Sequence, residues 1–132
     1  MKKVGLLHGE LSKVIAELAH EDIILIGDAG MPVPQGTKFI DLAIVNGVPS
    51  FIDVLNAVMS EMLIAKGIID EEQAEVSPQM GKKIRETVGD AFPLEIMPHA
   101  EVKKLSGRAK AVIRTGEFTP YSNIILEAGC LF

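Results

Sequence analysis

Three groups of polar side chains stand where predicted helices and strands end, which is where a fold can present them to a ligand. These groups are His20 with Asp28, His99 beside Pro98, and the segment Tyr121-Ser122-Asn123. An imidazole titrates near neutral pH, so His20 can both donate and accept a proton as a general acid–base catalyst. The carboxylate, phenol and amide groups of the others can hydrogen-bond the hydroxyl groups of a polyol. The residue types therefore indicate proton transfer on a polyhydroxyl ligand, or its binding.

Each group also has a purely structural explanation. His20 follows a predicted helix, and a histidine at that position interacts favourably with the helix dipole. Asp28 can cap the glycine-containing turn that follows it. His99 can be an ordinary surface histidine, Tyr121 can pack on the neighbouring proline, and Asn123 can be a turn residue. The residues alone leave both explanations open.

A metal site is the main alternative use of His8, His20, His99 and Asp28. No two of these histidines have the close spacing of a local zinc motif, so we expect no metal. The sequence also has no G-x-S-x-G, P-loop or G-x-G-x-x-G motif. The segment Gly27–Gly30 is too short to be a dinucleotide-binding fingerprint.

A buried strand is expected to position His20 and Asp28. Residues 23–27 form an apolar run without a polar interruption, which is typical of a strand buried on both faces. Gly30 and Pro32 prevent this run from continuing as a helix. His20 precedes the strand and Asp28 follows it. Ligands in open α/β sheets bind beyond the carboxyl ends of strands, which favours Asp28 as a site residue.

Helices and strands alternate along the rest of the chain. Apolar residues at i, i+3, i+4 and i+7 predict a helix over residues 10–19. Ser50 and Ser77 are the predicted N-caps of two further helices, which end at Gly67 and near Val88. The other expected elements are strands at 38–45, 94–97, 110–114 and 124–128, a short strand around 68–69 that the acidic run 70–75 disfavours, and a short helix over 99–106. This alternation predicts an α/β fold in layers around a mostly buried sheet.

The composition limits the classes of function. The 132 residues amount to one ordinary domain, and 48% hydrophobic residues provide a core that must be mainly aliphatic because only 5% are aromatic. The formal net charge of −5 argues against nucleic acid binding. No segment suits a membrane surface or a membrane span, and Val4–Leu7 is too short for the apolar core of a signal peptide. Cys130 is the single cysteine, so no intrachain disulfide forms, and a cytoplasmic protein is the default expectation.

Two segments resemble the D-ribose pyranase family, whose close relatives are the fucose mutarotases. They are Asp28–Pro34 and Ala109–Leu126, the second of which is long and specific. The resemblance extends over essentially the whole chain, although residues 69–94 match only in pattern. Two positions depart from the family pattern: His8 stands where we expect asparagine, and Met31 where we expect leucine.

The resemblance implies a single α/β/α domain over residues 1–132, built around a mixed, mostly buried sheet. It implies an isomerase that interconverts the pyranose and furanose forms of D-ribose and feeds ribose catabolism. In this assignment His20 is the catalytic proton donor, and Asp28, His99, Tyr121, Ser122 and Asn123 bind the substrate. The resemblance further implies a cytoplasmic enzyme that requires no metal or organic cofactor and forms a homodecamer of two stacked pentameric rings.

The chemistry of ring interconversion agrees with this assignment. Opening a hemiacetal ring needs a proton delivered to the ring oxygen and a proton removed from the anomeric hydroxyl. Reclosure through another hydroxyl reverses these roles, and a group that titrates near neutral pH, such as His20, suits the task. Two other functions stay open: a mutarotase for fucose or another monosaccharide, and a non-catalytic sugar-binding protein that assists ribose uptake. The segment Pro32-Val33-Pro34 favours ribose, because the fucose relatives differ there.

The length of the central strand suggests that the site is shared between subunits. Residues 23–27 span roughly 16 Å at about 3.3 Å per residue, so His20 and Asp28 of one chain should lie too far apart to touch one sugar. We therefore expect a neighbouring subunit to supply His20.

Overall fold

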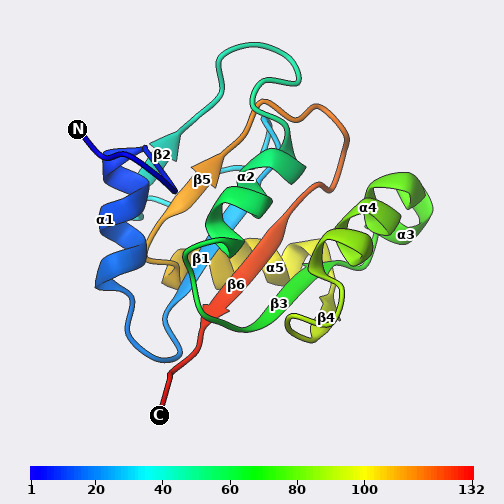
Figure 1. The fold of residues 1–132 in the computed structure, drawn as a ribbon. Helices are drawn as coiled ribbons and strands as arrows, with labels where there is room; N and C mark the ends of the chain where they lie inside the picture. The colour runs from blue at the N-terminus through cyan, green and yellow to red at the C-terminus, as the bar shows by residue number, and fades with distance from the viewer.

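The fold is built on a mixed six-stranded sheet with the strand order β2-β5-β1-β6-β3-β4 (Figure 1). We describe it from a computed structural model that covers residues 1–132. The strands are β1 Ile23–Gly27, β2 Phe39–Asp41, β3 Ile64–Asp70, β4 Leu94–Met97, β5 Val112–Arg114 and β6 Ile124–Ala128. The helices are α1 Gly9–Glu17, α2 Phe51–Met59, α3 Gln73–Val76, α4 Pro78–Val88 and α5 His99–Leu105, followed by a 3₁₀ turn η1 at Ser106–Arg108.

Only β6 runs against the direction of the other strands. It pairs antiparallel with β1 and with β3, whereas β1 with β5, β2 with β5 and β3 with β4 are parallel pairs. The carboxyl ends of β1, β3, β4 and β5 therefore meet at one edge of the sheet, together with the amino end of β6. Segments from distant parts of the sequence converge at this edge, where α/β sheets bind their ligands.

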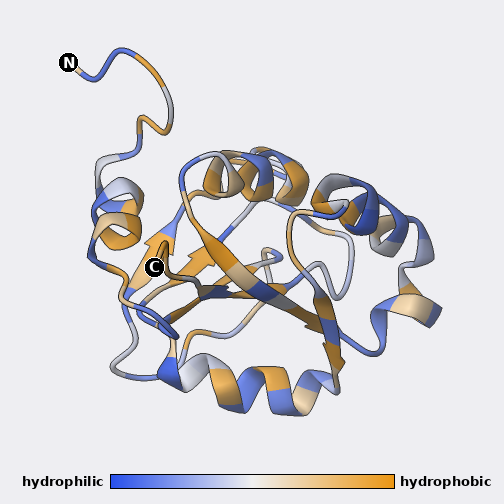
Figure 2. Ribbon diagram, turned by 60° about the horizontal axis from the view of Figure 1, so that its bottom comes forward, coloured by the Kyte–Doolittle hydropathy of each residue, from blue (hydrophilic) through white to orange (hydrophobic).

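Helices cover both faces of the sheet, as the predicted α/β/α layering requires (Figure 2). The larger apolar core lies between one face and α1, α2 and α4, and it includes Ile24, Ile26 and the fully buried Phe51. The smaller core lies between the other face and α5, and it includes Leu25 and Val102. Alternate residues of β1 thus enter opposite cores, which confirms that this strand is buried on both faces.

Three predicted elements have different bounds in the structure. The expected strand at 38–45 is reduced to β2, because the chain turns away after Asp41 and forms a loop with only an isolated bridge between Val45 and Val48. The strand at 110–114 is shorter and begins at Val112, and the helix expected over 10–19 is α1, which ends at Glu17. The elements at 23–27, 94–97 and 124–128 have the predicted bounds.

The prediction that the helix after Ser50 continues to Gly67 is wrong. The helix α2 ends at Met59, and Gly67 lies in the middle of β3, a seven-residue strand where only a short one was expected. A Cβ on Gly67 would lie 2.9 Å from atoms of Leu94 and Phe92. The glycine therefore permits close packing across the sheet instead of ending a helix.

The helix caps are partly as predicted. Ser50 caps α2, since its Oγ accepts a hydrogen bond from the backbone N–H three residues on at 3.1 Å. Ser77 precedes α4 but does not cap it, because its Oγ donates to the carbonyl of Pro120. His8 was not expected as a cap, yet its Nδ1 accepts the backbone N–H of Leu11 at 3.2 Å at the start of α1. None of the helices combines the length and hydrophobicity needed to cross a bilayer.

Candidate active site

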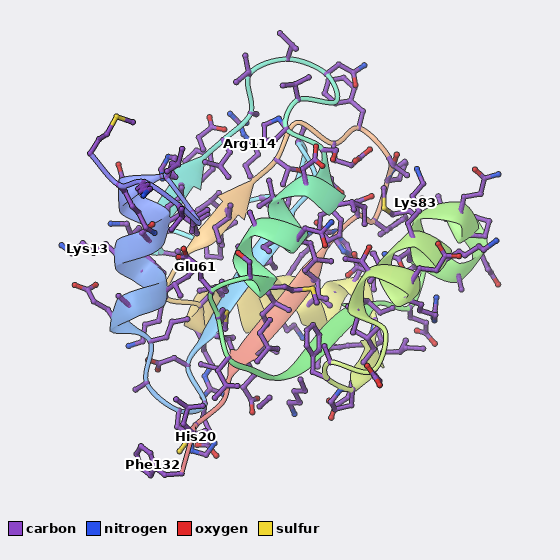
Figure 3. All side chains as sticks on the ribbon, in the orientation of Figure 1. Lys13, His20, Glu61, Lys83, Arg114 and Phe132 are labelled. Atoms are coloured by element: carbon purple, nitrogen blue, oxygen red, sulfur yellow. The ribbon has the colours of Figure 1, made fainter.

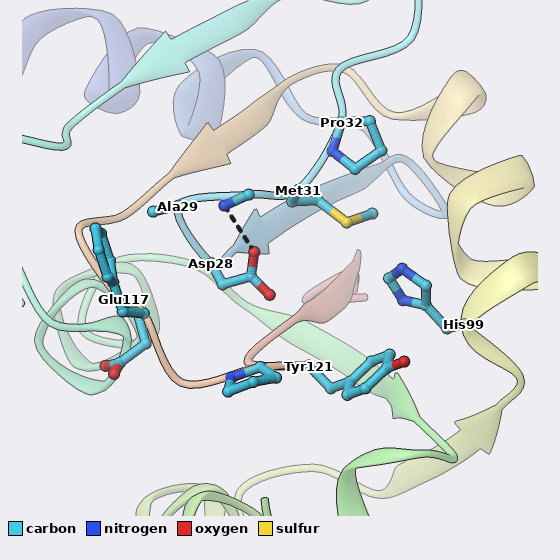
Figure 4. Close-up of a pocket in the computed structure, with 10 residues that line it drawn as sticks. Asp28, Ala29, Met31, Pro32, His99, Glu117 and Tyr121 are labelled. Carbon is cyan, nitrogen blue, oxygen red and sulfur yellow. Dashed lines mark hydrogen bonds between the residues drawn. The ribbon is translucent and has the colours of Figure 1, made fainter. Parts of the chain in front are cut away.

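A pocket of about 570 Å³ lies at the edge of the sheet where the carboxyl ends of the strands meet (Figure 4). Its walls are the segment after β1, the first residue of α5, and the loop between β5 and β6. The lining residues are Asp28, Ala29, Gly30, Met31, Pro32, His99, Glu117, Phe118, Pro120 and Tyr121. The structure therefore brings three predicted site residues, Asp28, His99 and Tyr121, into one pocket from three separate elements.

Asp28 both caps the turn after β1 and lines the pocket. Its Oδ1 accepts the backbone N–H of Gly30 at 2.9 Å, so the carboxylate caps the turn after β1. The same carboxylate faces the pocket. Burial raises the pKa of Asp28, against the opposing effect of the Gly30 hydrogen bond and the nearby His99. A partly buried carboxylate that still has accepting capacity is suited to binding hydroxyl groups.

Asn123 and Ser122 lie behind the pocket wall and do not line it. Both residues are fully buried. Asn123 accepts the backbone N–H of Asp28 at 3.1 Å through Oδ1 and donates to Asp70 at 2.7 Å through Nδ2. The Ser122 hydroxyl donates to the carbonyl of Thr119 at 2.8 Å. Their side chains therefore hold the wall in place, and only Tyr121 of the three-residue segment faces the cavity.

Asp70 is a residue of this region that the sequence reasoning missed. It ends β3, and its carboxylate Oδ1 lies 3.1 Å from Nδ1 of His99. Its side chain is completely inaccessible to solvent, and this burial raises the pKa of Asp70 against the hydrogen bonds from Asn123 and His99. The signal was available: Asp70 comes directly after the expected short strand at 68–69, as Asp28 comes directly after the strand at 23–27. The acidic run 70–75 instead weakened the prediction of a strand there.

The loop between β5 and β6 is held in a strained shape from behind. Tyr121 has φ +57°, in the left-handed region that non-glycine residues rarely occupy. Gln73 donates to the Tyr121 carbonyl at 2.8 Å, and Ser77 donates to the Pro120 carbonyl at 2.5 Å. The Tyr121 ring then meets His99 edge to face, with centroids 5.1 Å apart and planes at 86°. Residues around α3 and α4 thus determine where this ring sits.

Glu117 connects the same loop to α2. Its Oε1 accepts the backbone N–H of Phe51 at 3.1 Å, and its Oε2 accepts the hydroxyl of Thr119 at 2.8 Å. Because Phe51 begins α2, the carboxylate satisfies a free N–H at the helix N-terminus. No local pattern singles out Glu117, because its partner at Phe51 is 66 residues away in the sequence.

His20 lies far from this pocket. It is exposed in the turn between α1 and β1, near the C-terminal residue Phe132 (Figure 3). There it borders a separate, mainly apolar cavity of about 500 Å³ between the end of α1 and the C-terminal segment. His20 and Asp28 of one chain are thus at opposite ends of β1, as the strand length predicts. His8 is outside the Asp28 pocket as well, in a groove that includes Leu42.

The pocket offers hydrogen-bonding groups and an imidazole, but no metal-binding cluster. No group of three or more histidine, cysteine, aspartate or glutamate side chains is placed to hold a metal ion. Carboxylate, imidazole and phenol groups around a cavity of this size can bind the hydroxyls of a small polar ligand. His99 supplies the imidazole of the pocket, whose ring nitrogens can donate or accept a hydrogen bond.

The chain is similar to known proteins over its full length. The chain is 49% identical over 132 residues to a D-ribose pyranase of Limosilactobacillus reuteri, and the alignment covers both proteins completely. Its fold matches the structure of Bacillus subtilis RbsD complexed with D-ribose, with a TM-score of 0.95, 44% identity and complete coverage of both chains. The fucose mutarotase of Streptococcus pneumoniae shares the fold, with a TM-score of 0.81 and 21% identity over 96% of this chain and 95% of that chain. The model of the RbsD / FucU transport protein family matches residues 1–131, and the chain belongs to this family.

Proposed function

We propose that this protein is a D-ribose pyranase, an isomerase that interconverts the pyranose and furanose ring forms of D-ribose and so feeds ribose catabolism. The observation that carries the proposal is the full-length likeness to RbsD, whose structure was solved with D-ribose. The pocket formed by Asp28, His99 and Tyr121 supports it, because these groups can bind several hydroxyls of one pentose.

In this mechanism His20 acts as the proton donor. It donates a proton to the ring oxygen while the anomeric hydroxyl gives its proton to a water molecule, so the bond between the anomeric carbon and the ring oxygen breaks and the open-chain aldehyde forms. Attack of a different hydroxyl on the aldehyde carbon closes the furanose ring, and the proton movements run in reverse. Asp28, His99 and Tyr121 hold the sugar hydroxyls during these steps. Asn123 and Ser122 act from behind the wall, by fixing the Asp28 backbone and the loop that carries Tyr121.

The site requires a second subunit in this proposal. His20 of one chain is exposed beside an apolar cavity at the far end of β1, so it reaches the sugar only when a neighbouring chain brings its Asp28 pocket to it. Exposed apolar side chains provide surface for such contacts. They include Val4, Leu7, Phe39, Ile44, Val45, Val48, Leu63, Leu131 and Phe132. We propose that the assembly is a cytoplasmic homodecamer of two stacked pentameric rings.

Saturation-transfer NMR on D-ribose tests the activity directly. Saturating a pyranose signal should reduce the furanose signals strongly when the wild-type protein is present, and only weakly without it. The His20→Ala variant should return the exchange to the rate without protein, while still binding ribose through the Asp28 pocket. Wild-type protein that binds ribose without accelerating exchange would instead be a sugar-binding protein. Acceleration with L-fucose and not with D-ribose would identify a mutarotase of another sugar.

A further inference from the structure

The Asp70 carboxylate has no part in the proton transfers proposed above, although it lies directly behind the pocket. Its side chain has no solvent exposure, and burying a carboxylate costs free energy unless its oxygens are well paired. A buried apolar residue at this position would often be at least as stabilising, so core stability alone does not account for an acid there. Its side-chain partners are His99 and Asn123, both of which belong to the pocket or its wall.

The hydrogen bonds of Asn123 fix which of its atoms faces Asp70. Its Oδ1 accepts the backbone N–H of Asp28 at 3.1 Å, so its Nδ2 is the atom that donates to Asp70 Oδ2 at 2.7 Å. A backbone N–H can only donate, so the Asp28 N–H fixes which way the Asn123 amide is oriented. Asp70 therefore acts as an acceptor toward Asn123.

The second oxygen of Asp70 faces a ring nitrogen of His99. Oδ1 lies 3.1 Å from Nδ1, and an ionised carboxylate has no proton to donate. A neutral imidazole carries one proton, so this contact places the proton on Nδ1 and leaves a lone pair on Nε2. Nε2 makes no hydrogen bond within the chain, and the ring lines the pocket, so Nε2 is available to a ligand.

The other charged groups around His99 do not bond its ring. The Glu72 carboxylate accepts the His99 backbone N–H at 3.0 and 3.1 Å and so fixes the start of α5. Asp28 interacts with His99 through its charge, and Tyr121 presents a ring edge-to-face. Asp70 is therefore the one acid that sets the protonation pattern of the imidazole.

We propose that Asp70 is a positioning residue that holds His99 as the Nδ1–H tautomer, so that Nε2 accepts a hydrogen bond from a hydroxyl of the bound ribose. This inference rests on the proposed function for the identity of the sugar. Through Asn123 the same carboxylate also fixes the backbone of Asp28, so one buried group sets two sides of the pocket. Carboxylates that orient a functional histidine in this way act by fixing its tautomer and its ring orientation.

The Asp70→Asn variant reverses the hydrogen-bond polarity at His99 with almost no change of shape. Both partners of Asp70 are donors, but an asparagine offers one acceptor oxygen and one donor amide. The oxygen remains with Asn123, whose orientation the Asp28 backbone fixes, so the new amide faces Nδ1 of His99. Nδ1 must then accept, and the proton moves to Nε2. Glu72→Gln is the matched control, because it removes a charge near His99 but keeps an oxygen for the backbone N–H.

Nitrogen-15 NMR of the imidazoles measures the tautomer without any sugar. The chain has three histidines, and the His99 signals are those missing from a His99→Gln variant. At mildly alkaline pH, where a free imidazole is neutral, wild type and Glu72→Gln should show the proton on Nδ1, and Asp70→Asn should show it on Nε2. D-ribose should shift the Nε2 signal in the wild type, and Asp70→Asn should weaken ribose binding by about tenfold, the loss expected for one buried hydrogen bond.

The proposal is overturned if wild-type His99 carries its proton on Nε2, or if a folded Asp70→Asn protein keeps the wild-type tautomer and affinity. The wild-type spectrum alone decides the tautomer if the variant does not fold. A wild type that shows the expected tautomer but does not accelerate ring exchange would contradict the proposed activity and leave the role of Asp70 intact. A wild-type Nε2 signal that D-ribose does not move would contradict the contact to the sugar.

Discussion

His20 and Asp28 flank the same strand, β1, and they open into two separate cavities. The five residues of this strand span roughly 16 Å at about 3.3 Å per residue. One chain cannot place both side chains on a single pentose while β1 stays intact. Because β1 is buried and paired on both sides, a site that uses both residues must draw them from different subunits.

Mixing two inactive variants should restore activity if the site is shared. His20→Ala and Asp28→Ala homo-oligomers should each lack ring-exchange activity. After subunit exchange, a site is complete where a chain with an intact His20 contacts a chain with an intact Asp28. With random mixing of equal amounts, about one quarter of all sites are complete. Saturation-transfer NMR of the mixture measures the recovered rate. No recovery after verified exchange would contradict a shared site.

The control for this mixing experiment uses two variants of the same pocket. Asp28 and His99 belong to one chain, so a mixture of Asp28→Ala and His99→Ala leaves one defect in every site. This mixture should stay inactive. Recovery there would mean that mixing acts in some other way than by completing sites.

Local sequence patterns predicted the parts of the fold that local physics decides. The apolar run 23–27 identified β1 with its bounds, and the polar residues that flank it included both Asp28 and His20. Gly67 was misread because a glycine after an amphipathic run resembles a helix stop. Its actual role depends on Phe92 and Leu94, which pack against it from β4 and the segment before it.

The candidate site was only partly predictable because its support comes from distant residues. Asp70 bonds His99 and Asn123, which lie 29 and 53 residues away in sequence. Ser77 reads locally as a helix cap, but its hydroxyl is used by Pro120, 43 residues later. The spacing of residues along the sequence does not predict these contacts. They follow from the direction of β6, which returns the last loop to the edge where the parallel strands end.

Replacing Asp28 by asparagine should make the protein relatively more stable as the pH rises. Burial raises the pKa of Asp28 in the folded state above its ordinary value of 3.8. Between 3.8 and the raised pKa, the folded chain binds more protons than the unfolded chain, so this group lowers the stability of the wild type as the pH rises through that interval. The amide of the Asp28→Asn variant does not titrate, so the variant does not lose stability in this pH interval through residue 28. Urea unfolding below pH 3.8 and at neutral pH measures the difference between variant and wild type at each pH.

Replacing Asp41 by asparagine should have the opposite effect: the variant should become less stable relative to wild type as the pH rises. The hydrogen bond from Arg114 to Asp41 lowers the pKa of this carboxyl, so it stabilises the fold above pH 3.8 and the effect is lost as the pH falls through the lowered pKa. Asp41→Asn should therefore lose stability relative to wild type at neutral pH, by a small amount because the pair is exposed. The same sign for both variants would contradict the assignment of opposite pKa shifts.

Gly27→Ala should destabilise the fold and weaken ribose binding together. A Cβ on Gly27, the last residue of β1, would lie 2.8 Å from Cβ of Met31 and 3.0 Å from Oδ1 of Asn123. Relieving these contacts moves the turn that carries Asp28 and the amide that holds it, at a cost of roughly 1–3 kcal/mol typical of overpacking. Thermal unfolding and ribose titration measure the two effects.

Gly9→Ala is the matched control for this substitution. Gly9 is the first residue of α1, and a Cβ there meets no atom within 4 Å. The alanine should leave ribose binding unchanged and stabilise the protein by about 0.4–1 kcal/mol, because it restricts the unfolded chain. A Gly27→Ala protein that is as stable as Gly9→Ala and binds ribose as tightly would contradict the close packing behind the pocket.

Tyr121→Phe should separate the contribution of the phenol hydroxyl from that of the ring. The hydroxyl has no hydrogen-bond partner within the chain, whereas the ring meets His99 edge to face at 5.1 Å and would do so equally as phenylalanine. Stability should therefore change by less than about 0.5 kcal/mol. If the hydroxyl binds the sugar, the dissociation constant for D-ribose should rise roughly 2- to 10-fold, the range expected for one hydrogen bond. Calorimetric titration with D-ribose measures this change, and an unchanged affinity would show that Tyr121 shapes the pocket through its ring alone.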